Sequence, residues 1–241
     1  MKKTLMLSIF LYCLTPVFSQ TISTFPYTQD FEAEATCSTG CGAVCNTLLT
    51  WSNPTTDDLD WLVDVGGTGS SATGPSVDHT LGSASGKYVY VETSCDGTGY
   101  SYKRADLVSP YFNITALPLA GVEFWYHAYG TTQGVLNVEA KIGMQGTFVN
   151  IGGPYQDDLD EWQKVELMFV GSIYEGQDSV QVRFVYVSGT SFGGDIALDD
   201  ISIKSIVPLV PVPLANWPIW VGIAAIGGIL VFRYRRKIVG L

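Results

Sequence analysis

The chain is predicted to be all-β, a jelly roll or β-sandwich of two packed antiparallel sheets, followed by one C-terminal transmembrane helix. Apolar and polar residues alternate with period two in 136–142, 164–169 and 179–186, a pattern typical of strands with one buried and one solvated face. Glycine-rich turns such as 66–69 and 188–194 separate the strand patterns, and many short strands joined by turns indicate a sandwich or jelly roll. An amphipathic helical pattern is absent from the sequence before the C-terminal span.

Residues 1–19 are predicted to be a secretory signal peptide. Lys2 and Lys3 supply the charged start, 5–14 is apolar, and Val17-Phe18-Ser19 resembles a cleavage site. Cleavage there would make Gln20 the first residue of the exported chain. An uncleaved anchor is the alternative, although the apolar run is short for a bilayer span.

Residues 20–206 are predicted to form one extracellular domain, since this length can bury a single core. Besides the three alternating segments, further strands are expected in 61–65, 87–92, 105–108, 122–129 and 195–203. Two Asp-Asp-Leu-Asp runs, at 57–60 and 157–160, are interpreted as chance or as loop chemistry.

The C-terminal region is predicted to anchor the chain. Residues 207–213 are a proline-rich spacer, 214–232 are uncharged and long enough to span a bilayer, and 233–241 carry four basic residues. By the positive-inside rule, this basic tail is cytoplasmic and the domain lies outside. The order of short motif, apolar span and basic tail also resembles bacterial sorting signals, so cleavage before the span during transfer to the surface stays open.

The charge distribution argues against nucleic acid as a partner. The whole chain has a formal net charge of −10, but six of its thirteen basic residues lie at the two ends. The predicted ectodomain keeps seven basic residues against all twenty-three acidic ones, a net charge of −16. Nucleic-acid affinity depends on Lys and Arg neutralising phosphates. The acidic balance is compatible with cation binding and with plain solubility.

Four cysteines remain after removal of the signal peptide: Cys37, Cys41, Cys45 and Cys95. An even number in an exported chain indicates disulfides, and four cysteines allow three pairings. Zinc is the rival interpretation. The Cys-x3-Cys-x3-Cys spacing differs from that of the usual zinc pairs, and the expected compartment is oxidising.

The sequence predicts no catalytic activity. His79 and His127 are its two histidines, and neither accompanies a Ser or Cys in a recognisable nucleophile setting. His127 alternates with Trp125 and Tyr129, which favours a packed or surface aromatic. The zinc-protease motif His-Glu-x-x-His is absent from the sequence.

Residues 193–203 have the apolar alternation of a strand, but two adjacent carboxylates, Asp199 and Asp200, interrupt it. Because unpaired carboxylates are costly to bury, this pair predicts a cation or backbone donors as partners. Together with 73–80, 87–92 and 124–130, the segment makes 25–206 resemble a MAM domain, an extracellular jelly-roll module of adhesive receptors and secreted proteases.

This resemblance implies a calcium ion, as in some members of the family, and one structural Ca²⁺ is therefore expected. The acidic positions that match are Glu32, Asp58, Asp60, Asp78, Asp199 and Asp200. The alternative is that these side chains cap turns and accept backbone hydrogen bonds. The family also places a cysteine after Ser109-Pro110, where this chain has Tyr111, so Cys95 is expected to reach the N-terminal cysteines instead.

The sequence favours a non-catalytic adhesion or recognition module, displayed outside the cell, that takes a protein or glycan ligand. A carbohydrate-binding module of a bacterial envelope protein is the alternative, and an enzyme of unknown type is a third hypothesis. The aromatic side chains considered as stacking faces for a glycan are Trp51, Trp61, Tyr100, Tyr102, Trp125 and Trp162.

Overall fold

A computed structural model describes residues 21–171 and 173–207. One compact unit ends at Ile206. The predicted signal peptide (1–19), most of the spacer (208–213), the span (214–232) and the tail (233–241) lie outside the described residues. Within the described part of the chain, no helix is long and apolar enough to cross a membrane.

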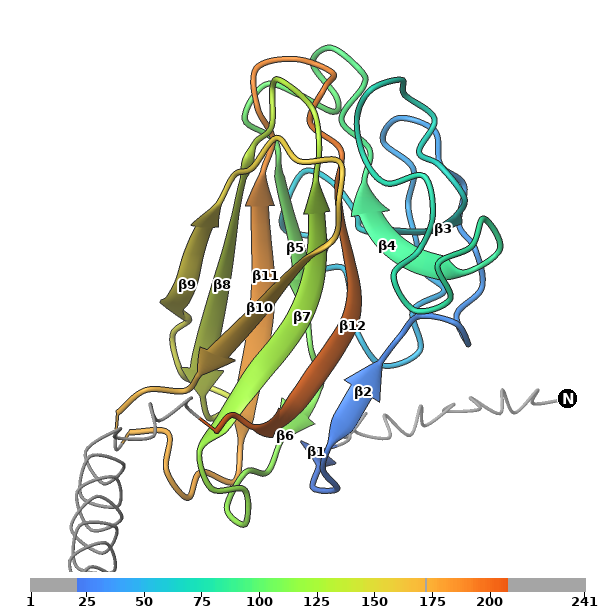
Figure 1. Cartoon of the computed structure of the whole chain (residues 1–241). Coiled ribbons are helices and arrows are strands. Elements are labelled where there is room, and N and C mark those ends of the chain that lie inside the picture. The colour runs from blue at the N-terminus through green and yellow to red at the C-terminus, as the bar shows by residue number, and fades with distance from the viewer. Residues whose placement is uncertain (1–20, 172, 208–241) are drawn as a thin grey trace, which may run out of the picture. The chain divides into compact units, whose positions relative to one another are not determined.

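The domain is a sandwich of two sheets (Figure 1). The first sheet has the order β1-β6-β11-β8-β9, and β5 also pairs with β11. Its strands are β1 (Thr21–Ile22), β5 (Arg104–Val108), β6 (Tyr111–Phe112), β8 (Val135–Ile142), β9 (Val149–Tyr155) and β11 (Val180–Val187). The pairing of β1 with β6 is parallel, and the other pairs of this sheet are antiparallel.

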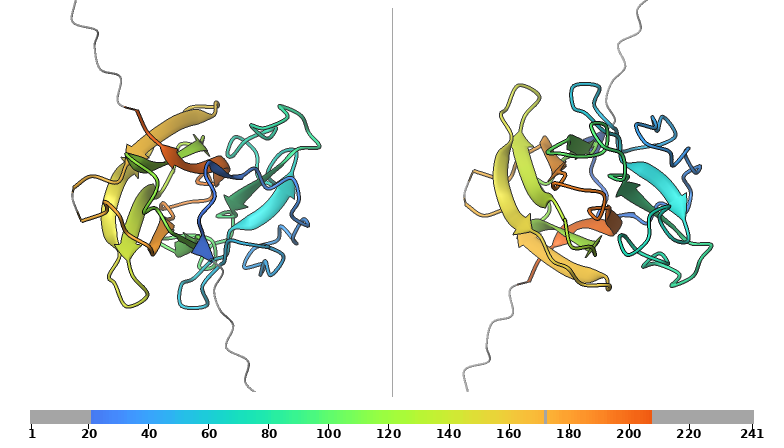
Figure 2. Two further views of the ribbon diagram at one scale, coloured as in Figure 1. Left: turned by 90° about the horizontal axis from the view of Figure 1, so that it is seen from below. Right: turned by 90° about the horizontal axis from the view of Figure 1, so that it is seen from above.

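The second sheet has the order β10-β7-β12-β4-β3, and β2 also pairs with β12. Its strands are β2 (Tyr27–Gln29), β3 (Leu62–Val65), β4 (Lys87–Val91), β7 (Ala120–Ala128), β10 (Gln163–Met168) and β12 (Ile196–Ser205). All of these pairs are antiparallel. The views from below and above show the two layers facing each other (Figure 2).

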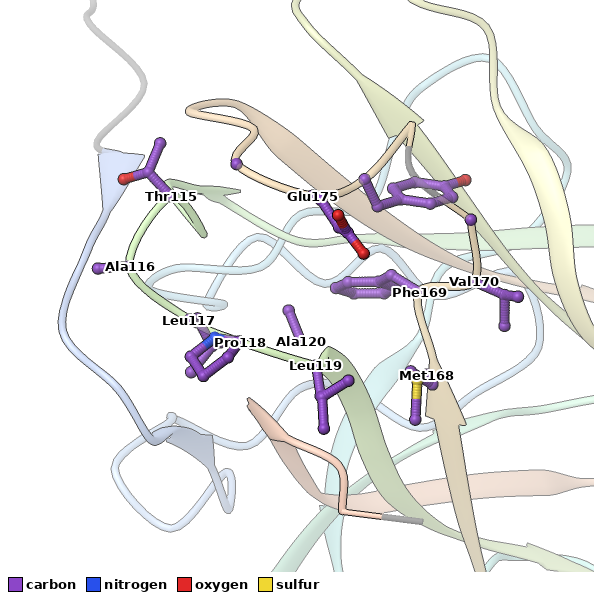
Figure 3. A pocket seen from close by; sticks show the side chains of 13 residues that line it. Thr115, Ala116, Leu117, Pro118, Leu119, Ala120, Met168, Phe169, Val170 and Glu175 are labelled. Atoms are coloured by element: carbon purple, nitrogen blue, oxygen red, sulfur yellow. The ribbon is translucent and has the colours of Figure 1, made fainter.

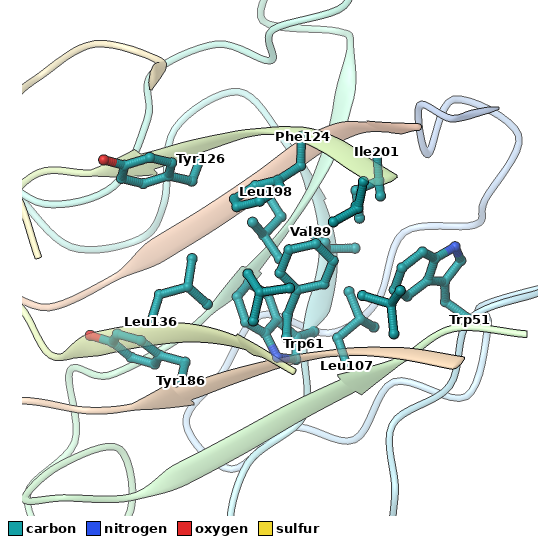
Figure 4. Packing of buried hydrophobic residues seen from close by; sticks show 14 of the residues in the cluster. Trp51, Trp61, Val89, Leu107, Phe124, Tyr126, Leu136, Tyr186, Leu198 and Ile201 are labelled. Carbon is teal, nitrogen blue, oxygen red and sulfur yellow. The ribbon is translucent and has the colours of Figure 1, made fainter. Parts of the chain in front are cut away.

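The core lies between the sheets, where the alternating apolar residues meet (Figure 4). Phe124 of β7 and Phe184 of β11 come from opposite sheets, and their rings pack edge to face at 4.8 Å. Trp61 and Leu107 are also fully buried. Burying one such side chain contributes about 1.5–3 kcal/mol.

Each of the eight predicted strands matches an observed one, which confirms the all-β prediction. Four strands were not predicted. β1, β2 and β6 have only two or three residues, too few to show a period. β9 contains Gly152-Gly153-Pro154, which resembles a turn, but it lies at the edge of its sheet, where proline is tolerated because no ladder hydrogen bond is lost on the solvent side.

Candidate functional site

A β-bulge in β12 accommodates the adjacent carboxylates. Asp199 is opposite Trp125 of β7, whereas Ser202 is opposite Glu123, so β12 carries one extra residue. Asp200 occupies this bulge with a φ of 47°, in the left-handed region that aspartate tolerates better than most residues. The bulge shifts the alternation, so that both Leu198 and Ile201 are buried. This explains the broken pattern in the sequence.

The loop 78–83 supplies the partners of Asp199. Its Oδ2 accepts hydrogen bonds from the backbone N–H groups of His79 at 2.9 Å and Thr80 at 3.2 Å. Its Oδ1 accepts from the N–H of Asp200 at 2.8 Å. Asp199 is fully buried. Backbone donors are therefore the partners of this carboxylate, one of the two kinds that the sequence predicted.

Asp200 is half-buried and binds side chains of the same loop. Its Oδ2 lies 2.5 Å from Nδ1 of His79, and its Oδ1 accepts from the Thr80 hydroxyl at 2.9 Å. The His79 ring also stacks on Trp125, with ring centroids 3.8 Å apart. The loop is thus fixed on the outer side of β7 and β12 by both charge and stacking.

Burial and the neighbouring negative charge of Asp200 raise the pKa of Asp199 to about 7, despite the three backbone hydrogen bonds. Desolvation disfavours the charged form of a carboxyl group, and a like charge does the same. A cation beside the pair would lower this cost.

The other four predicted calcium ligands accept hydrogen bonds from backbone N–H groups outside the bulge. Asp78 accepts from the N–H groups of Leu81 and Ser83, at 2.5 and 2.9 Å, and closes the loop on itself. Glu32 accepts from the N–H of Lys87 at 2.7 Å. The Lys87 ammonium in turn donates to the carbonyls of Glu32 and Glu34, each at 2.7 Å.

Asp58 and Asp60 lie away from the bulge. Asp58 accepts from the N–H of Arg104 at 3.0 Å, and Asp60 accepts from the N–H of Cys45 at 2.8 Å. The structure therefore does not bring the six carboxylates together as one ligand set. Among residues 21–171 and 173–207, no group of three or more His, Cys, Asp or Glu side chains is placed to hold a metal ion. Calcium binding stays a prediction, which we confine to the Asp199–Asp200 pair.

The carboxylates of the two Asp-Asp-Leu-Asp runs accept backbone hydrogen bonds that join loops to strands. In the first run, Asp57 accepts from the N–H of Asp106 at 2.6 Å, beside the Asp58 bond to Arg104, so the run caps β5. In the second run, Asp158 accepts from the N–H of Gly130 at 2.9 Å, after the end of β7. Both runs hold strand ends through their carboxylates.

A second buried carboxylate, next to the start of β12, was not singled out from the sequence. Asp195, just before the strand, is fully buried. Its Oδ1 accepts from the N–H and the hydroxyl of Thr93 at 2.9 and 3.1 Å, while its Oδ2 has no partner among the described residues. Burial, followed by the charge of Glu92, raises its pKa to about 7. Asp195 was placed at the start of the expected strand 195–203, but its burial had no local signal in the sequence.

The four cysteines form two disulfides. Cys37 pairs with Cys45, with Cα atoms 5.5 Å apart, and Cys41 pairs with Cys95, with Cα atoms 5.9 Å apart. Cys95 thus reaches the N-terminal cysteines, as expected from Tyr111. The second bridge closes a loop of 54 residues, and such bridges typically stabilise a domain by about 2–4 kcal/mol.

The aromatic candidates for glycan stacking differ in accessibility. Trp51 and Trp61 are buried core residues, 2% and 0% exposed. Trp125 has one face covered by His79, and Trp162 packs against His79 and His127. Tyr102, in contrast, is 69% exposed. His127 is buried, which is the packed alternative of the two that the sequence left open.

Tyr102 borders a cavity of about 370 Å³ at the end of the sandwich where β8 begins and β11 ends. The lining residues are Tyr102, Thr131, Thr132, Gln133, Gly134, Val135, Gln156, Val187, Ser188, Gly189 and Thr190. We call this the Tyr102 cavity. Loops far apart in the sequence build it, and the sequence indicated only Tyr102.

A cavity of about 590 Å³ lies where the chain leaves the fold (Figure 3). Its walls are the loop 115–120 and the segment 168–171 with 174–176, and apolar side chains such as Leu117, Leu119 and Phe169 dominate them. The N–H of Ile206 donates to the carbonyl of Leu119 at 2.8 Å. The lining of this cavity is mainly apolar, whereas the lining of the Tyr102 cavity is mainly polar.

Several known proteins are similar to this chain. The MAM domain-containing glycosylphosphatidylinositol anchor protein 2 of Mus musculus is 31% identical over 195 residues, covering 76% of this chain and 19% of that protein. Neuropilin-1 of Xenopus laevis is 26% identical over 187 residues, covering 77% and 18%. The K1 cleaved adhesin domain of Lys-gingipain from Porphyromonas gingivalis W83 is 13% identical with a TM-score of 0.45, covering 76% of this chain and 100% of that domain.

The chain thus spans less than a fifth of the length of these curated relatives. MAM domains are non-catalytic adhesion or recognition modules. Residues 30–206 match the family described as MAM domain, meprin/A5/mu, and the chain belongs to the MAM domain family.

Proposed function

We propose that the chain is an extracellular recognition module held at a membrane by its C-terminal segment. Family membership supports the recognition role. The apolar run 214–232 and the four basic residues after it support the anchor. The names of the relatives include an anchor protein and neuropilin, which is consistent with display at a surface.

The two disulfides support an oxidising location for the domain. Disulfides persist in secreted and surface proteins and are rare in the cytosol. Both bridges join the segment 37–45 to itself or to Cys95, after β4, so a reducing compartment would release this segment. We infer that residues 20–206 fold after export.

The anchor is tested with the full chain and a version that stops at Ile206, both produced with the natural signal peptide. We expect protease added to intact cells to digest the domain of the full chain, while a tag after Leu241 stays protected. The shortened chain should be released into the medium. Retention of the shortened chain at the membrane would contradict the anchor.

The mass of the mature full chain separates two forms of anchoring. A retained span gives a product from Gln20 to Leu241, whereas sorting by cleavage gives a product that ends before residue 214.

The recognition role is tested by coating beads with the domain and measuring cell binding before and after reduction of the disulfides. Equal binding by folded and reduced domain would contradict specific recognition.

A further inference from the structure

The Tyr102 cavity is uncharged, although the domain around it is strongly acidic. None of its eleven lining residues is Asp, Glu, Lys, Arg or His, whereas residues 20–206 carry twenty-three acidic side chains. Hydroxyl and amide groups of Thr132, Gln133, Gln156, Ser188 and Thr190 provide its polar chemistry. Such a lining suits a neutral ligand that can both donate and accept hydrogen bonds.

Gln133 is fixed in the wall of this cavity by two hydrogen bonds from its side-chain amide. Only 8% of the residue is exposed. Its Nε2 donates to the carbonyls of Tyr129 at 2.7 Å and Asp195 at 3.0 Å, which fixes the amide. Its Oε1 has no hydrogen-bond partner among the described residues, and neither does Oγ1 of Thr132. Both atoms are buried from solvent, so the polar groups that a ligand can reach are the exposed ones of Thr131, Gln156 and Thr190.

Tyr102 supplies a flat apolar face at the rim. Its N–H donates to the carbonyl of Gly189 at 3.3 Å, which ties its backbone to the cavity wall. Its φ is 59°, and the side chain is 69% exposed. A tyrosine ring combines an apolar face with a hydroxyl at its edge, the two features that contact the C–H face and the hydroxyls of a sugar ring.

The wall beside Tyr102 is closely packed and therefore preformed. A Cβ atom at Gly189 would collide with the carbonyl of Thr132, and one at Gly134 would collide with the carbonyl of Val187. Glycine at both positions lets the β8 and β11 ends approach closely. The cavity thus needs little rearrangement to bind, which favours affinity.

We propose that the Tyr102 cavity binds a neutral oligosaccharide, with a sugar ring on Tyr102 and sugar hydroxyl groups bonded to the exposed Gln156 amide and the Thr131 and Thr190 hydroxyls. This inference rests on the proposed recognition function and names its ligand class. It also moves the glycan site away from Trp125 and Trp162, whose rings pack against His79.

The experiment uses the folded full chain in a non-glycosidic detergent, applied to a glycan array that carries neutral, sialylated and sulfated oligosaccharides. The dissociation constant of the strongest neutral oligosaccharide is then measured for the unaltered chain, Tyr102→Ala, Tyr102→Phe and Phe192→Ala. Phe192 is the matched control, because it is 54% exposed on the loop that carries Thr190 but does not itself line the cavity.

We expect Tyr102→Ala to weaken binding about tenfold or more, equivalent to about 1.4 kcal/mol. Tyr102→Phe keeps the ring and should bind within about twofold, and Phe192→Ala should bind like the unaltered chain. Circular dichroism of each variant confirms folding, which these exposed positions should not disturb.

Three results would overturn the inference: no neutral oligosaccharide bound, only anionic ones bound, or equal losses for Tyr102→Ala and Phe192→Ala. A peptide or protein ligand would show itself by cell binding that persists in Tyr102→Ala. In those cases the protease test of surface display still decides the proposed function, because it does not depend on the ligand.

Discussion

Asp195 and Asp199 lie four residues apart at β12, and both are fully buried with a pKa raised to about 7. Their surroundings differ. Both oxygens of Asp199 accept backbone N–H groups from His79, Thr80 and Asp200, whereas Asp195 satisfies Oδ1 alone and leaves Oδ2 beside the charge of Glu92. Equal burial and equal pKa therefore conceal different roles. Asp199 organises a loop, and the burial cost of Asp195 is only partly offset by its hydrogen bonds from Thr93.

Replacing aspartate by asparagine should lower the free energy of unfolding more at Asp199 than at Asp195. Asp199→Asn puts an NH₂ group opposite at least one backbone N–H, so two donors face each other in a buried place. We expect the free energy of unfolding of the domain ending at Ile206 to fall by about 2–4 kcal/mol, measured by urea denaturation. An unchanged midpoint would show that the loop 78–83 does not depend on this carboxylate.

Calcium should act at Asp199–Asp200 and not at Asp195. The paired charges repel, and an ion that binds only the folded form at a hundredfold excess over its dissociation constant stabilises it by about 2.7 kcal/mol. We expect the melting temperature to rise with calcium and to fall with chelator. Asp200→Asn should blunt this shift, while Asp178→Asn, exposed and distant in sequence, should preserve it. Identical melting curves with and without calcium would leave these carboxylates with hydrogen bonding alone.

Asp195→Asn should stabilise the domain at alkaline pH. The raised pKa means that the folded state holds its proton between pH 4 and 7 while the unfolded state loses it, so stability declines as pH rises through this range. The asparagine keeps its oxygen for Thr93 and carries no charge. We expect it to gain about 2 kcal/mol over the unaltered chain on going from pH 5 to pH 8, followed by urea midpoints. A pH-independent difference would contradict the cost assigned to Asp195.

The His79 side chain should matter least. His79→Gln keeps the backbone N–H that Asp199 binds and removes the half-exposed pairing with Asp200 and the stack on Trp125. Partly exposed ion pairs are worth about 0–1 kcal/mol, so the expected loss is about 1 kcal/mol by thermal melting. A loss as large as that of Asp199→Asn would mean that the ring, and not the backbone, holds the loop.

Alternation predicted strands such as β8, in which buried and half-buried residues alternate, whereas β4 and β12 are buried on both faces over most of their length. It did not predict β9, whose Gly152-Gly153-Pro154 resembles a turn until its edge position is known. The break in the apolar alternation at Asp199 and Asp200 was visible in the sequence, and it corresponds to the bulge in β12. Backbone donors were one of the two kinds of partner predicted for these carboxylates, and they bind Asp199.

The partners themselves were harder to predict. The loop that binds Asp199 lies 119 and 120 residues away, and no local pattern records such a pairing. Acidic residues are abundant in this chain, so Asp58 and Asp60 resembled calcium ligands in the sequence. In the structure they accept hydrogen bonds from the backbone N–H groups of Arg104 and Cys45. Likewise, Gln133 carries no sequence signal, because its role depends on burial and on a hydrogen bond to the Asp195 carbonyl, 62 residues away.

The position of β12 has a mechanical consequence. Its first end is linked to the Tyr102 cavity through the bond from Gln133 Nε2 to the Asp195 carbonyl, and its last residues lead to the exit at Ile206, about 30 Å further along the strand. In the tethered arrangement proposed above, a pull between ligand and membrane would run along this strand. β12 pairs with β7 on one side and with β4 and β2 on the other. Because antiparallel ladder bonds lie across the strand, such a pull would load them together in shear instead of opening them one by one.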